Sequence, residues 1–152
     1  MALDETDKKL LLFLQEDAKQ TTKELSYKLG LSVTAVYERI KKLENTGVIS
    51  KYVAILDRNK VNRDFIVLCH VKLTQHKKEH VLQFEREIMT LQEVTECFHV
   101  SGDYDYILKI GVKDIADYRH FMLSKLTTLQ HIASTHSSFM ISEVKNTTSI
   151  VL

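Results

Sequence analysis

Residues 21–47 read TTKELSYKLGLSVTAVYERIKKLENTG, and this stretch decides the fold of the first part of the chain. Thr21 and Glu24 have the spacing of a capping box, in which a hydroxyl and a carboxylate bond the free amides of a helix start. Gly30 ends that helix, because glycine adopts the left-handed conformation after a helix without steric cost. Ser32 caps a second helix two residues later. The stretch therefore predicts a helix-turn-helix.

The second helix separates an apolar stripe from a polar face. Val36, Ile40 and Leu43 recur at helical spacing and are expected to face inward. A helix of this kind enters the major groove and reads base edges from its N-terminal half. The residues expected at DNA are those of its outer face and the hydroxyls at the helix starts: Thr21, Thr22, Ser32, Thr34, Ala35, Glu38, Arg39, Lys41 and Lys42.

The basic residues on this face have two expected roles. Arg39 suits a guanine edge or a phosphate, whereas Lys41 and Lys42 suit phosphates, which set affinity rather than sequence preference. The alternative is an ordinary surface helix with a solvated charged face. The short turn, the caps and the clean inner stripe together favour DNA binding.

The overall charge of +1 conceals an uneven distribution. Residues 34–60 hold six Lys and Arg against three acids, so this segment carries +3 and the remainder −2. Such a patch would bind DNA weakly in a monomer. It becomes effective when an oligomer presents it more than once.

Length and composition narrow the class of protein. The 152 residues allow one domain or two small ones, and the hydrophobic share of 44% is usual for a globular protein. Cys69 and Cys97 lack paired metal-ligand spacing and are expected to be reduced, buried thiols. No apolar run approaches the ~18 residues of a membrane span, and the first residues lack a signal core, so a cytoplasmic location is expected.

Residues 48–56, VISKYVAIL, are short and β-branched and read as a strand, whereas residues 57–64 are polar and read as a linker. The expected organisation is a helix-turn-helix domain over 1–50, a strand and linker over 51–64, and a ligand-sensing and oligomerisation domain over 65–152.

In the second domain, the spacing of apolar residues switches repeatedly between the period of a strand and the period of a helix. Its expected elements are a strand over 65–73, a helix over 77–89, strands over 94–100 and 104–112, a helix capped by Asp114, and a last strand over 132–144. This βαββαβ order is the ferredoxin-like plan, an antiparallel sheet with both helices on one face, so the whole chain is α+β.

Such a sheet leaves its other face uncovered. We expect Cys69, Ile107 and some of residues 139–141 there, and burial of this face against a second copy would remove apolar area from water at ~25 cal/mol per Å². A symmetric dimer also suits a helix-turn-helix protein that reads paired half-sites.

The chain resembles the Lrp/AsnC family of leucine- and asparagine-responsive regulators over nearly its whole length. The motifs that carry the resemblance are LDETDKKLLLFLQEDAK, ELSYKLGLS, ERIKKLENTGVI, ECFHVSGDYDYILKI and DYRHFM. The resemblance implies a winged-helix-like DNA-binding domain, an αβ-sandwich sensor domain, dimers that associate further, often to octamers, and effectors that are usually amino acids. Val33 stands where family members often have Pro, which is favoured at that position but not required.

The resemblance also implies an effector site. The family's Gly-Asp-aromatic-Asp motif falls on Gly102–Asp105, facing a neighbour's last strand, here Ser134–Ser138. The implied effector residues are Ser101, Gly102, Asp103, Tyr104, Asp105, Ser134, Thr135, His136, Ser137 and Ser138. Carboxylates would accept the ammonium of an amino acid, while turn amides and hydroxyls would bond its carboxylate. The alternative is a plain hairpin turn.

No cofactor, metal or catalytic activity is expected. The seven histidines are scattered, and no nucleophile elbow, phosphate loop or zinc-protease motif is present. Three functions stay open: an amino-acid-responsive regulator binding double-stranded DNA, a ligand-independent architectural DNA-compacting protein, and a metabolic sensor subunit without DNA binding. The recognition helix argues against the third.

Overall fold

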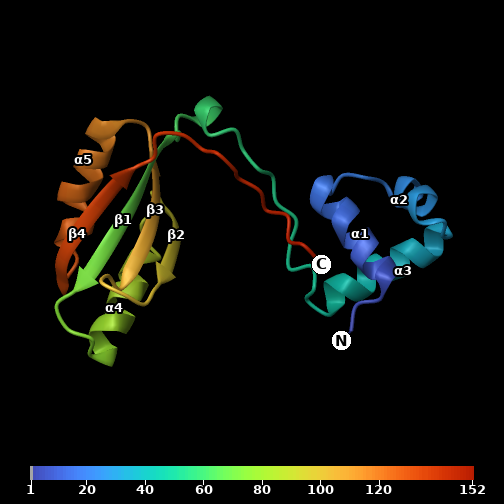
Figure 1. The fold of residues 1–152 in the computed structure, drawn as a ribbon, viewed down its shortest axis with the longest axis horizontal. Helices are drawn as coiled ribbons and strands as arrows, with labels where there is room; N and C mark the ends of the chain where they lie inside the picture. The colour runs from blue at the N-terminus through green and yellow to red at the C-terminus, as the bar shows by residue number, and fades with distance from the viewer. Residues whose placement is uncertain (1) are drawn as a thin grey trace. The chain divides into compact units, whose positions relative to one another are not determined.

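The computed structural model describes residues 2–152, which form two units (Figure 1). One unit comprises the residues up to Ile55 together with Val144–Leu152, and the other comprises Leu56–Glu143. None of the helices in the described part of the chain is both long and apolar enough to cross a membrane.

Three helices form the first unit: α1 (Glu5–Glu16), α2 (Thr22–Leu29) and α3 (Val33–Asn45). Asp4 starts α1 through a capping box with Asp7, whose amide donates to Asp4 Oδ1 at 2.7 Å. Gly30 has a φ of +65°, so the chain turns sharply between α2 and α3. The predicted helix-turn-helix is confirmed.

A small apolar core holds these helices together. It consists of Leu10, Leu11, Leu25, Val36 and Leu43, at most 7% exposed. Removal of these side chains from water stabilises the unit, because each belongs to the inner stripe of its helix.

The strand predicted over 48–56 is wrong for the single chain. Within the described residues, the segment from Ser50 to Asp57 has no strand partner. Val53 and Ile55 are 65% and 72% exposed. β-branched residues favour an extended backbone, but a strand forms only where a neighbour bonds its amides.

The second unit is a four-stranded antiparallel sheet with the order β2-β3-β1-β4. Its strands and helices are β1 (Phe65–Leu73), α4 (Lys78–Ile88), β2 (Val94–His99), β3 (Tyr106–Val112), α5 (Ile115–Ser124) and β4 (Ile132–Phe139). Short 3₁₀ turns at Asn59–Val61 and Leu126–Thr128 precede β1 and β4. The βαββαβ order is confirmed, although β4 ends five residues before the predicted Val144.

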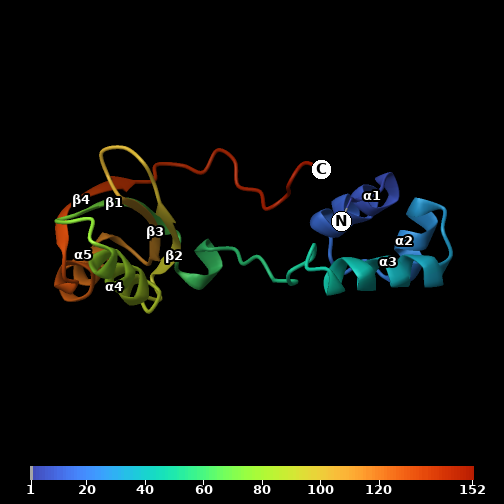
Figure 2. The ribbon, with the colours of Figure 1, turned by 90° about the horizontal axis from the view of Figure 1, so that it is seen from below.

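Both helices cover one side of the sheet (Figure 2). The core on this side contains alternate residues of β1 and β3 packed against Phe84 of α4 and Phe121 of α5. The side chains of β1 that point away from the helices include Leu68 and His70, which pair with Lys109 and Ile107 across the sheet. We call this second side the open face.

The structure corrects the expected composition of the open face. Cys69 is fully buried on the helix side, where burial raises the pKa of its thiol. Phe139 also lies on the helix side, with its ring 5.7 Å from Phe65 and from Tyr118. The period of two in a strand sets these positions, so the prediction is wrong for Cys69, whereas Ile107 pairs with His70 on the open face as predicted. Cys97 is exposed rather than buried.

Candidate DNA-reading helix and effector site

The outer face of α3 presents polar side chains to solvent. Thr34, Glu38 and Lys42 are exposed there, and Ala35 is half-buried. Lys41 is paired with Glu44 at 2.8 Å. Because an exposed ion pair contributes little free energy, the Lys41 ammonium remains available to a phosphate.

Arg39 lies differently from the prediction, which put it on the outer face. Its Nη1 atom donates to Asp4 Oδ2 at 2.7 Å and to Asp7 Oδ1 at 2.6 Å. Asp7 is only 1% exposed. Hydrogen bonds to the two carboxylates raise the pKa of Arg39. Arg39 therefore fixes α3 to the start of α1, and its guanidinium is already occupied.

Two exposed side chains on this unit were missed by the sequence reading. Tyr37 is 49% exposed, and its ring lies 5.8 Å from the Lys41 ammonium. It stands three residues after Thr34 and four before Lys41, so helical spacing could have placed all three on one face. Tyr27 of α2 is 76% exposed. An aromatic ring beside a basic side chain suits the apolar and phosphate surfaces of DNA.

The predicted hydroxyls at the helix starts act as caps. Thr21 Oγ1 accepts from the Glu24 amide at 3.2 Å, and Ser32 Oγ accepts from the Ala35 amide at 3.1 Å. Thr22 begins α2 and is half-buried. The hydroxyls thus cap the first turns of α2 and α3, and helix starts of this kind attract phosphate.

The turn between β2 and β3 carries the predicted effector motif. Gly102 has a φ of +121°, a conformation open to glycine. Ser101 and Asp103 are exposed at this turn. Asp103 is therefore a carboxylate that an incoming ammonium group can reach.

Asp105 is committed to the structure of the turn. Its Oδ2 accepts from the Leu73 amide at 2.7 Å, and its Oδ1 lies 2.7 Å from His76 Nε2. Its own amide donates to the Val71 carbonyl at 2.9 Å. Burial raises the pKa of Asp105, but the Leu73 and His76 bonds outweigh it, so the net shift is downward. The two acids of the motif thus differ in role.

The β4 stretch divides between the two faces of the sheet. Ser134, His136 and Ser138 pair with Lys72, His70 and Leu68 and share the open face with them, while Thr135 and Ser137 point to the helix side. Ser137 Oγ lies 2.6 Å from the Tyr118 hydroxyl, and burial raises the pKa of Tyr118 to about 12. One pocket on the open face can therefore use only three of these five residues.

The rings of Tyr104, His136 and His70 lie close together within one chain, at the corners of a triangle. The His70 ring is 5.3 Å from Tyr104 and 6.0 Å from His136, and Tyr104 and His136 are 6.3 Å apart. The buried Nδ1 of His70 has no hydrogen-bond partner among the described residues. His70 was not predicted here, because the register that pairs it with His136 is invisible in the sequence.

The candidate effector site thus combines the exposed Asp103 carboxylate at the turn with aromatic side chains on the open face. The exposed Asp103 carboxylate can accept hydrogen bonds from an ammonium group. Residues 2–152 contain no cluster of three metal-ligating side chains.

Two family models match the chain. The Lrp/AsnC ligand binding domain matches residues 66–150, and a winged helix-turn-helix DNA-binding domain matches residues 3–50. The boundary between the matched ranges agrees with the change from helices to sheet in the structure.

Similar proteins extend over almost the whole chain. The leucine-responsive regulatory protein of Haemophilus influenzae is 38% identical, over 99% of this chain and 91% of its own length. The transcriptional regulator AzlB of Bacillus subtilis is 36% identical, over 97% and 94%. A transcriptional regulator of Neisseria meningitidis, solved as an L-Met complex, is 33% identical with a TM-score of 0.94, over 98% of this chain and 96% of that one.

Proposed function

Since this chain belongs to the Lrp/AsnC family, we propose that it is a sequence-specific DNA-binding transcriptional regulator that responds to an amino-acid effector. DNA binding is assigned to α3, effector binding to the turn at Ser101–Asp105 and the open face. No catalytic step is assigned to any residue.

The exposed face of α3 carries the DNA proposal. Thr34 and Glu38 are exposed in the first half of the helix, from which base edges are read. Lys42, farther along the same helix, is suited to contact a DNA phosphate through its ammonium group. Arg39 acts differently: by bonding Asp4 and Asp7 it fixes the angle at which α3 is presented.

A mobility-shift titration at several salt concentrations tests this assignment. Lys42→Ala should weaken binding to all sequences alike and reduce the salt slope by about one, because one phosphate contact is lost. Thr34→Ala should instead change the preference among operator sequences. Lys113→Ala, an exposed lysine of the other unit, is the matched control. Equal DNA affinity and salt slope for Lys42→Ala and Lys113→Ala would contradict the proposal.

The amino-acid effector is supported by the chemistry of the open face and by the L-Met complex of the Neisseria meningitidis relative. Asp103 is the accessible acid of the motif for the ammonium group, and Asp105 holds the turn in shape. His70, Tyr104 and His136 line the neighbouring surface and would contact the effector side chain.

A thermal-shift series against the twenty amino acids tests the effector. At an amino-acid concentration one hundred times its Kd, binding stabilises the folded protein by about 2.7 kcal/mol, which is a readily measured shift. Asp103→Ala should abolish the shift, while Glu143→Ala, an exposed acid outside the site, should retain it. If no amino acid shifts the wild type while DNA binding persists, the architectural alternative is favoured instead.

A further inference from the structure

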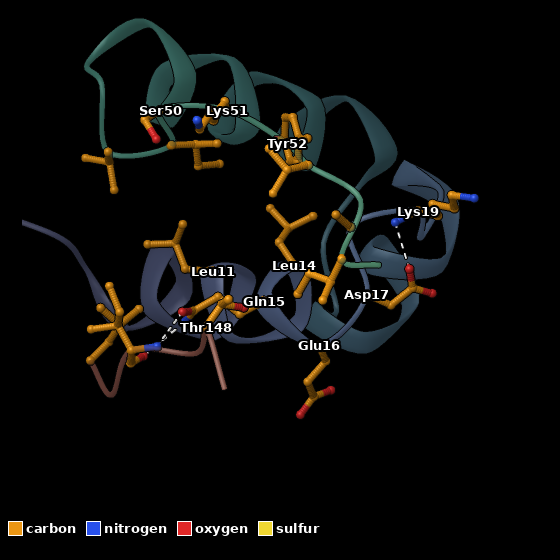
Figure 3. Close-up of a pocket in the computed structure, with 17 residues that line it drawn as sticks. Leu11, Leu14, Gln15, Glu16, Asp17, Lys19, Ser50, Lys51, Tyr52 and Thr148 are labelled. Atoms are coloured by element: carbon orange, nitrogen blue, oxygen red, sulfur yellow. Dashed lines mark hydrogen bonds between the residues drawn. The ribbon is translucent and has the colours of Figure 1, made fainter. Parts of the chain in front are cut away.

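The last residues of the chain pack against the DNA-binding unit. The Gln15 side chain of α1 bonds both backbone groups of Ile150, as the dashed lines in Figure 3 mark. Its Nε2 donates to the Ile150 carbonyl at 3.0 Å, and its Oε1 accepts from the Ile150 amide at 2.6 Å. A neighbouring strand would make the same pair of bonds, so one side-chain amide replaces a strand partner here.

The tail forms one wall of a largely apolar groove. A cavity of about 620 Å³ is lined on one side by Leu11 and Leu14 of α1 and on another by residues 48–53 and Ile55 (Figure 3). The tail residues that line it are Thr148, Ile150 and Leu152. Ser149 and Val151 do not line it, and Val151 is 96% exposed. This alternation is the period of two of an extended segment that presents one edge to the groove.

We propose that the α1 side of this groove, with Gln15 at its edge, is a receptor for an extended, aliphatic peptide, and that its occupant is the C-terminal tail Thr148–Leu152 of the same chain, which thereby becomes one wall of the groove. Ile150 remains 68% exposed and Leu152 46% exposed. The two hydrogen bonds from Gln15 therefore contribute much of the affinity, and the aliphatic contacts contribute the remainder.

The groove lies apart from the residues assigned to DNA. None of the residues that line it belongs to α3, but Val48 and Ile49 begin three residues after the end of that helix. The tail is the continuation of β4, which carries His136. If the proposed function holds, the docked tail gives the effector strand a second connection to the DNA-binding unit, made by hydrogen bonds and aliphatic contacts instead of by a peptide bond.

Binding of a labelled peptide with the sequence of residues 144–152 tests the groove directly. We expect the peptide to bind a chain that ends at Glu143 and to bind the full chain at least ~10-fold more weakly, because the attached tail competes. In the shortened chain, Gln15→Met should reduce affinity by about 5- to 100-fold through the loss of two hydrogen bonds. A peptide with Val151→Ser is the matched control and should bind as the original does. Equal binding to the full and shortened chains, or no effect of Gln15→Met, would overturn the proposal.

Hydrogen exchange of the full chain tests the same contact if the shortened chain does not fold. The Ile150 amide should exchange slowly in the wild type and quickly in Gln15→Met, while the melting temperature of the sensor unit is unchanged. Protection of Ile150 that increases with protein concentration would mean that a second copy supplies the tail, and would overturn its assignment to the same chain. Neither measurement uses DNA or an effector, so failure here is separate from failure of the proposed function.

Discussion

Among the residues predicted to bind DNA, Arg39 differs most between prediction and structure in its position and contacts. Basic residues on a recognition helix are expected to point to DNA, and the helical spacing gives no reason to treat Arg39 differently from Lys42. Its two acidic partners are 35 and 32 residues away in the sequence, at the start of another helix. Asp4 and Asp7 were visible as a helix start but not as the partners of an arginine.

Replacing Arg39 should therefore destabilise the first unit. Arg39→Met leaves the Asp7 carboxylate, 1% exposed, without its cation, and we expect a loss of about 1–3 kcal/mol in the free energy of unfolding. Lys42→Met, on the exposed face, should change it by less than about 0.5 kcal/mol. Urea denaturation followed by circular dichroism measures both. Equal stability of the two variants would show that the Arg39 bonds contribute nothing net.

The contrast between Asp103 and Asp105 predicts a pH dependence. The pKa of Asp105 is lowered from its ordinary 3.8 in the folded protein, so its bonds to Leu73 and His76 stabilise the fold at pH values above 3.8. This stabilisation is lost as the pH falls below 3.8 and Asp105 becomes protonated. Asp105→Ala should be less stable than wild type at pH 6, and the difference should shrink in acid. Asp103→Ala, at the exposed position two residues earlier, is the matched control, and denaturation between pH 6 and pH 2.5 compares the two variants.

At the scale of elements, local signals were sufficient for the helices and insufficient for the sheet. Thr21 with Glu24, and Gly30 with Ser32, act within a few residues, so the sequence alone located both helix starts and the turn. Strand pairing joins distant residues. The βαββαβ order along the chain was predicted from the hydrophobic pattern. The pairing of His70 with His136 was not predicted, nor was the side of the sheet on which Cys69 is buried. A strand over 48–56 was predicted from composition, although it has no partner within the chain.

The β2–β3 hairpin depends on its glycine. Gly102 has a φ of +121°, which an L-residue adopts only with strain, and a Cβ there would meet no atom within 4 Å. Gly102→Ala should thus destabilise the protein by about 1–3 kcal/mol through its backbone alone. Ser101→Ala, at the neighbouring exposed position, should be within about 0.5 kcal/mol of wild type. Thermal denaturation of the two variants decides whether the cost is conformational; equal melting temperatures would refute it.

At the scale of the whole molecule, the open face of the sheet is the surface we expect a second copy to cover. Leu68 and Phe98 are 41% and 53% exposed on it, and Ile107 lies beside them. A stable dimer buries about 1,200–2,000 Å² in total. The mixture of aliphatic and histidine side chains suits an interface that is apolar at its centre.

A charged residue at this position should separate the copies. Leu68→Glu in the full chain is expected to be monomeric at micromolar concentration, because a carboxylate buried without a partner costs several kcal/mol. Lys113→Glu, outside the sheet, should keep the mass of the wild type. Light scattering reads both masses. A wild-type monomer would refute the dimer, and an unchanged mass for Leu68→Glu would locate the interface elsewhere.

The docked tail closes a loop along the chain. The chain leaves the first unit after Ile55 and returns to it at Val144, and the bonds between Gln15 and Ile150 close a loop between residues 135 positions apart. A protease that cuts once in the exposed segment from Lys51 to Leu56 would then leave two fragments, held together by the docked tail residues Thr148–Leu152. Such a nicked protein would run as two bands in a denaturing gel. Under native conditions it would migrate as one species as long as the tail stays bound to the first unit.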